Sequence, residues 1–137
     1  MRAMVIGVTK AILLSTIMFT LLLSVTQAEV FVCEKDCEFT SIQSAIDSAK
    51  AGDTIVAEGP FFENLNITKS VVLTGNATLY PSGAEAGVRV SADNVKISGL
   101  NIKGGIVGME VINARGVKIE DSSFSRNFYG IQLSGSR

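Results

Sequence analysis

Three short segments of this chain repeat at a regular interval. They are residues 87–91, 108–112 and 130–134, and each begins with glycine. A second pair keeps the same phase, because the Val-Lys-Ile of residues 95–97 returns at residues 117–119. The interval of about 22 residues falls within the range of solenoid repeats. Each copy is too short to bury an apolar face alone, so the copies must stack on one another, and the repeat predicts a solenoid with an extended surface.

The segments between the repeats predict parallel strands. After residue 52 the sequence has short β-branched runs separated by glycine, asparagine and serine turns, with no hairpin dipeptide between matched partners. This pattern predicts an all-β parallel β-helix with three strands in each coil, and residues 54–137 are long enough for roughly four coils. The side chains expected to face inward are Val88, Val90, Val95, Ile97, Leu100, Ile102, Met109, Val111, Val117, Ile119, Phe124 and Phe128.

One amphipathic helix is predicted ahead of the coils. Apolar residues recur every three or four positions over residues 41–50, which gives the helix a single apolar stripe. Thr40 and Gln43 match a capping box, with Thr40 as the N-cap, and Gly52 stands where a C-cap glycine is expected. The stripe must lie over another element.

Two glycine-containing pairs are expected to interrupt the strands that follow this helix. Gly59-Pro60 should end a strand over residues 54–57, and Gly75-Asn76 should form the next turn.

Residues 1–28 have the pattern of a secretory signal peptide. Arg2 and Lys10 form a positive region, residues 11–25 are an uncharged apolar run, and small residues precede a cut after Ala28. The alternative is an uncleaved membrane anchor, although a membrane span needs roughly 20 apolar residues. The predicted parts of the chain are a signal peptide (1–28), a disulfide loop with a capping helix (29–52) and truncated β-helix coils (53–137).

The composition excludes several classes of function. Beyond residue 28, ten lysines and arginines stand against 13 acidic residues without forming a stripe, so nucleic acid is not an expected partner. Histidine is absent, and Met109 is the one methionine after residue 28. The sequence therefore predicts no copper or zinc site, no imidazole base and no cofactor.

Cys33 and Cys37 lie just behind the leader with three residues between them. In a secreted chain an even pair of cysteines indicates a disulfide. The spacing is one residue longer than a thioredoxin-type motif, and a metal site would need more ligands. We predict a structural Cys33–Cys37 disulfide whose stabilising effect is small, because the loop that it closes is short.

Several segments carry a resemblance to a known family. Residues 39–49, 52–56, 63–64 and 69–75 resemble the opening of pectin-lyase-like right-handed β-helix proteins, above all the NosD-like group, and Gly-Ile-x-Leu-x-x-Ser at residues 130–136 is similar to that group's coil repeat. The resemblance implies a right-handed β-helix whose predicted helix is an N-terminal cap. It also implies a relation to carbohydrate-binding proteins and sugar hydrolases, although one fold hosts many functions. The copper association of NosD is not transferred, because histidine is absent.

Proteins of this family usually have many more coils than residues 53–137 can form. The sequence stops at Arg137 within a repeat, and solenoids need a cap at each end. We therefore expect the last coil either to self-associate or to be covered by another chain.

No second carboxylate occupies the equivalent position in a neighbouring coil, as a pair for glycoside hydrolysis would require. Two carboxylates must flank the scissile bond about 5–10 Å apart. Glu120 and Asp121 are neighbours, so on a strand they point to opposite faces, and Gly99 occupies the position one coil before Asp121. Asp121 is interpreted as a solvated turn residue, and no catalytic residue is assigned.

Two pairs of charged residues share a phase between coils. Lys96 and Lys118 form a basic row that could contact a polysaccharide of uronic acids, and the alternative is an ordinary solvated face. Arg89 and Glu110 predict an exposed ion pair between coils, which contributes little to stability.

Asparagines and aromatic pairs supply the remaining candidates. Asn66 and Asn76 begin Asn-x-Thr sequons and are candidate glycosylation sites, while the alternative for Asn66 is a coil bend where its side chain satisfies backbone groups. In the pairs Phe61-Phe62 and Phe128-Tyr129, one ring could face out and stack on a sugar. The large burial gain of aromatics favours the alternative, in which both pairs fill the core.

These features predict a secreted or cell-surface module that binds carbohydrate or assembles with other chains, without catalysis. Its expected partners are a polysaccharide or a cell-envelope glycan, or a second copy through the last coil, and membrane contact is limited to an uncleaved leader. The alternative is a fragment of a polysaccharide lyase or glycoside hydrolase whose catalytic coils are missing. A third is a shortened gene product without activity of its own.

Overall fold

The structure is a computed structural model, and it describes residues 26–137. The predicted signal peptide, residues 1–28, falls outside the described residues except for its last three positions. Within residues 26–137, no helix is long and apolar enough to cross a membrane.

The chain forms a β-solenoid of about five coils in which the paired strands run parallel, as the sequence predicts. Four coils come from residues 54–137, and the segment assigned to the disulfide loop adds another, because Glu29–Cys33 pairs with the start of the next coil. The elements are β1 (Glu29–Cys33), α2 (Ile42–Ser48), β2 (Thr54–Phe61), β3 (Leu65–Ile67), β4 (Val72–Leu79), β5 (Val88–Val90), β6 (Lys96–Ser98), β7 (Leu100–Lys103), β8 (Val107–Ile112), β9 (Lys118–Glu120), β10 (Ser123–Ser125) and β11 (Tyr129–Ser134).

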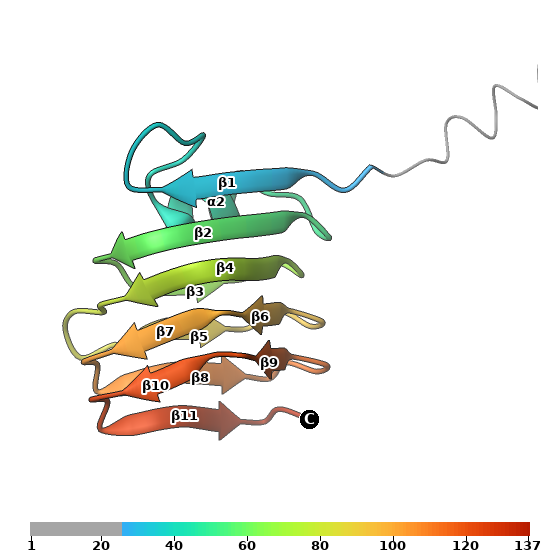
Figure 1. The fold of residues 1–137 in the computed structure, drawn as a ribbon. Coiled ribbons are helices and arrows are strands. Elements are labelled where there is room, and N and C mark those ends of the chain that lie inside the picture. The colour runs from blue at the N-terminus through green and yellow to red at the C-terminus, as the bar shows by residue number, and fades with distance from the viewer. Residues whose placement is uncertain (1–25) are drawn as a thin grey trace, which may run out of the picture.

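Two parallel sheets make up the walls of the solenoid (Figure 1). The larger sheet has the order β1-β2-β4-β6-β9, and β7 and β10 extend it from β4. The smaller sheet has the order β11-β8-β5-β3. The long strands β2 and β4 are replaced in the later coils by two shorter strands, so the prediction of three strands per coil holds for the fourth and fifth coils alone.

The core consists of rows of apolar side chains stacked from coil to coil. Of the side chains predicted to face inward, those of coils three and four are buried, whereas Val117, Ile119 and Phe124 in the fifth coil are partly buried. Phe128 is wrongly predicted, since it is 79% exposed. It lies in the turn before β11 and packs edge-on against Tyr129 rather than inward.

The two glycine pairs do not interrupt the strands. Gly59-Pro60 lies within β2, which corrects the strand end predicted there, and Gly75-Asn76 lies within β4, which corrects the predicted turn. Gly59 and Gly75 have positive φ angles of 106° and 124°, so each bends its strand while the parallel pairing continues. A side chain at Gly75 would collide with the backbone of Ala57 in the coil before it, so glycine here permits close stacking.

The helix begins later and ends earlier than predicted. Phe39 still pairs with Val32 as extended chain, so Thr40 does not cap the helix, and Ser41 is the N-cap instead. The C-cap is Ala49 rather than Gly52. The apolar stripe itself is as predicted, since its side chains at Ile42, Ala45 and Ile46 are buried beneath the helix.

Candidate functional site

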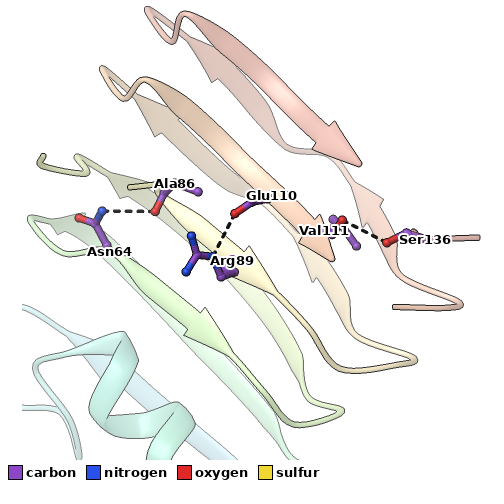
Figure 2. Close-up of polar contacts among 6 residues, drawn as sticks. All are labelled: Asn64, Ala86, Arg89, Glu110, Val111 and Ser136. Carbon is purple, nitrogen blue, oxygen red and sulfur yellow. Dashed lines mark hydrogen bonds and ion pairs between the residues drawn. The ribbon is translucent and has the colours of Figure 1, made fainter. Parts of the chain in front are cut away.

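Polar side chains of one coil contact side chains or backbone carbonyls of the neighbouring coil. Figure 2 shows three of them: the Asn64 amide donates to the Ala86 carbonyl at 3.2 Å, Arg89 Nε pairs with Glu110 at 3.0 Å, and Ser136 Oγ donates to the Val111 carbonyl at 3.1 Å. Each contact joins residues 21 to 25 positions apart.

The Arg89–Glu110 ion pair is present as predicted. The two residues are register partners in β5 and β8, with their side chains 45% and 22% exposed. An exposed pair of this kind contributes little to stability.

The predicted basic row is partly neutralised. Lys96 and Lys118 are register partners in β6 and β9, but Lys96 Nζ lies 3.0 Å from Glu120 Oε2. The hydrogen bond and charge of Lys96, with a smaller effect of Lys118, lower the pKa of the Glu120 carboxyl. The row therefore carries one net positive charge rather than two, and contact with a polysaccharide stays a prediction.

Asp93 and Asp121 lie in the bends between strands. Asp121 occupies a turn with φ of 46°, and the Asp93 carboxylate accepts a hydrogen bond from the backbone of Arg115 at 2.8 Å. Among residues 26–137, no group of three or more histidine, cysteine, aspartate or glutamate side chains could hold a metal ion. The Asp93 carboxylate therefore has a local structural role.

Both sequon asparagines are exposed on strands, Asn66 in β3 and Asn76 in β4. The side chain of Gln43 binds both backbone groups of Asn66, accepting from its N–H at 2.7 Å and donating to its carbonyl at 3.2 Å. The alternative predicted for Asn66 was that its own side chain would satisfy backbone groups at a bend. In the structure the Gln43 side chain has this role at β3.

The predicted disulfide is present. Cys33 and Cys37 are bonded, with their Cα atoms 5.6 Å apart, in the loop between β1 and α2.

The two aromatic pairs were expected to fill the core, but most of their rings are exposed. Phe61 is buried but Phe62 is 81% exposed, and Phe128 and Tyr129 are both exposed. Phe62 stacks on Tyr80, with ring centroids 5.1 Å apart and planes 16° apart. Core filling is therefore wrong for three of the four rings.

A hollow of about 340 Å³ lies beside this stacked pair. Its lining residues are Tyr80, Lys103, Gly104, Ser125 and Arg126. This cluster was not predicted from the sequence, although Tyr80, Lys103 and Arg126 are evenly spaced at an interval close to that of the coil repeat. That even spacing was the available signal.

Comparisons with known proteins point to a relative at the cell surface. No family model matches the chain, and no solved structure matches it. The chain is similar to a cell surface glycoprotein of Methanothermus fervidus, with 32% identity over 107 residues. The match covers 74% of this chain but 18% of that protein, so the similarity concerns one segment of a much longer polypeptide.

Proposed function

We propose that this chain is an extracytoplasmic β-helix module of the cell surface that binds carbohydrate or assembles with other surface chains, without catalysis. The observation that carries the proposal is the similarity to a cell surface glycoprotein over 107 residues. The Cys33–Cys37 disulfide supports it, because disulfides persist in oxidising compartments. The walls of parallel sheet offer an extended surface rather than an enclosed pocket.

Membership of the pectin-lyase-like group, with NosD-like proteins as its nearest members, is part of this proposal. Parallel coils behind a short amphipathic helix support it. The proposed parts are a cleaved leader (1–28), the disulfide loop and capping helix (29–52) and the coils (53–137).

Location and processing are tested on intact cells of the producing organism. An externally added protease should remove the epitope of the coils from whole cells. In a separate measurement, the intact mass of the protein isolated without protease should match a chain that begins at Glu29 and contains one disulfide. Protection of the epitope until the cells are lysed would refute the surface assignment.

Glycosylation at Asn66 and Asn76 is proposed on their exposure and sequons. Asn66→Gln and Asn76→Gln should each remove one glycan mass from the native protein. An unmodified native mass at both sites would refute this part.

The enzymatic alternative has a direct test. Incubation with a panel of acidic and neutral polysaccharides should release neither reducing ends nor unsaturated products, while the chain is retained on at least one of the polymers. Turnover would establish the lyase or hydrolase alternative instead.

Self-association through the last coil is also proposed, because Ile131 and Leu133 are 45% and 67% exposed side by side on β11. Sedimentation should show oligomers that Leu133→Lys disperses. A strictly monomeric chain at high concentration would refute it.

A further inference from the structure

We propose that the hollow beside Tyr80 binds an anionic saccharide, with a sugar ring on the Tyr80 face and its acidic group between Lys103 and Arg126. This inference rests on the proposed carbohydrate-binding function and names its site and ligand class. It places the site on a corner of the solenoid, away from the Lys96–Lys118 row.

The register of the strands brings the site together from three coils. Leu79, Ile102 and Phe124 are paired in β4, β7 and β10, and Lys103 is paired with Ser125. Tyr80, which directly follows Leu79, therefore lies one coil from Lys103. The result is a row along the corner that is aromatic at one end and basic at the other.

The aromatic end offers a flat apolar platform. Phe62 covers part of Tyr80 by stacking, yet Tyr80 stays 38% exposed and lines the hollow. Phe62 holds the Tyr80 ring in place, which lowers the entropy lost when a ligand binds. The C–H face of a pyranose ring packs on such a surface, while the hydroxyl of tyrosine stays free for hydrogen bonds.

The basic end carries charge that the described residues do not neutralise. The ion pairs found within residues 26–137 are Arg89–Glu110 and Lys96–Glu120. No acidic residue lines the hollow that Lys103 and Arg126 share. A guanidinium fork and an ammonium group around one hollow match a carboxylate or a sulfate.

The backbone of Arg126 supplies an independent indication. Its φ is 58°, in the left-handed region that side chains rarely adopt, and the matching position one coil earlier is Gly104 with φ of 85°. Glycine adopts a positive φ angle without steric cost, as Gly104 does in the earlier coil. The other side chains with positive φ in the described residues are aspartate and asparagine, which tolerate this region better than arginine does, so the arginine at this bend supports a function for the guanidinium.

The test measures binding of a uronic-acid hexasaccharide to the full chain by calorimetry. Its comparison ligands are the same hexasaccharide with carboxylates reduced to alcohols, a sulfated hexasaccharide and inorganic sulfate. We expect the uronate or the sulfated sugar to bind at least tenfold more tightly than either the reduced sugar or sulfate alone. Equal binding of the reduced sugar would overturn the role of the anionic group, and equal binding of inorganic sulfate would overturn the role of the ring.

Arg126→Gly separates a binding role from a structural one. The glycine fits the left-handed φ, so the melting temperature should stay the same or rise while affinity falls at least tenfold. Tyr80→Ala and Lys103→Gln should weaken binding to a similar degree. Lys35→Gln, which removes an exposed charge in the disulfide loop and lies outside the lining of the hollow, should leave binding within twofold. A lower melting temperature with unchanged affinity in Arg126→Gly would overturn the proposal.

The outcomes also distinguish this site from the broader function. Binding that survives all three corner substitutions would overturn the corner site and leave carbohydrate binding intact. Failure of every saccharide to bind the unmodified chain would overturn both.

Discussion

The first and fifth coils differ in how far their side chains are covered. In the first coil α2 lies beside β1 and β2 (Figure 1), and its Ile46 side chain is buried. In the fifth coil every residue of β11 is exposed. One in-register row makes the contrast measurable: Ile67, Val90 and Val111 are at most 1% exposed, but Leu133 is 67% exposed. Burial of a repeat position therefore depends on having a neighbour on both sides, as in any linear stack.

The first coil is held by polar contacts as well as by apolar packing. The Glu63 carboxylate, which follows β2, accepts hydrogen bonds from Ser41 Oγ and from the backbone N–H groups of Ile42 and Gln43, at 2.8 to 3.1 Å. These are free N–H groups at the start of α2, where a negative charge is favourable. The second coil thus fixes the N-terminus of the helix.

The C-terminus of α2 is fixed by a cation from the same coil. Lys69 Nζ donates to the carbonyls of Ile46, Asp47 and Ala49 at 2.6 to 3.1 Å. Gln43, by binding both backbone groups of Asn66, also closes the outer edge of β3, where the smaller sheet begins. An edge covered in this way cannot add another strand.

The largest difference between the coils should appear when one side chain in the shared row is shortened. Ile67→Ala leaves a cavity in a fully buried site and should lower the free energy of unfolding by about 3 kcal/mol. Leu133→Ala removes a similar side chain from an exposed site and should change it by less than about 0.5 kcal/mol. Chemical denaturation of both variants, at a concentration low enough for the chain to be monomeric, measures the difference, and equal losses would contradict the exposure of Leu133 within the monomer.

The stacked row of apolar positions could be predicted from the sequence, but the contacts that hold the helix over the first coil could not. The spacing of the repeat glycines fixed the phase of Val90 and Val111, because parallel stacking brings equivalent positions into register. The capping helix was also readable, since an apolar stripe in a helix gives a local signal. Local patterns were therefore enough for the coil and for the cap.

What the sequence could not predict depends on contacts between coils. Glu63 and Lys69 act on residues 20 to 23 positions away and belong to no local motif. Gly75 looked like a turn because close stacking on Ala57 demands the same residue type as a bend. Tyr80 and Arg126 were missed although they are evenly spaced with Lys103, because the repeat glycines that set the phase follow a slightly shorter interval and these three residues differ in type.

The next largest effect is expected at the start of the capping helix. Glu63→Gln removes the charge and part of the acceptor capacity that serve three donors, so the free energy of unfolding should fall by about 2 kcal/mol. Thermal and chemical unfolding measure the change. Glu58→Gln, an exposed residue of β2, makes the same charge change and should have almost no effect. Equal losses for the two variants would mean that general charge, rather than the cap, is responsible.

A smaller effect is expected at the other terminus of the helix. Lys69→Gln removes an ammonium group from three C-terminal carbonyls and should lower the free energy of unfolding by about 1 kcal/mol. Lys118→Gln makes the same substitution in the last coil, where the side chain is exposed, and should be close to neutral. Amide exchange should also accelerate within α2 for Lys69→Gln alone, and unchanged exchange there would contradict this account.

The last prediction compares the response of the two coils to acid. Hydrogen bonds from the backbone N–H groups of Lys50 and Ala28 lower the pKa of the buried Asp53 carboxyl in the first coil, and Lys96 lowers that of Glu120 in the fifth. A carboxyl whose pKa is lowered by folding stabilises the protein above its unfolded pKa, about 3.9 for aspartate and 4.3 for glutamate, and this contribution is lost as the pH falls through the folded pKa.

The difference in stability between the unmodified chain and Asp53→Asn should therefore be greatest near neutral pH and narrow below pH of about 4. Glu120→Gln should show the same trend at low salt. In 0.5 M salt the Glu120 difference should nearly vanish, because an exposed ion pair is screened, while the Asp53 difference should persist because its partners are backbone dipoles at hydrogen-bond distance. Loss of both differences in salt would mean that Asp53 is held by long-range charge, and the two coils would then respond to acid in the same way.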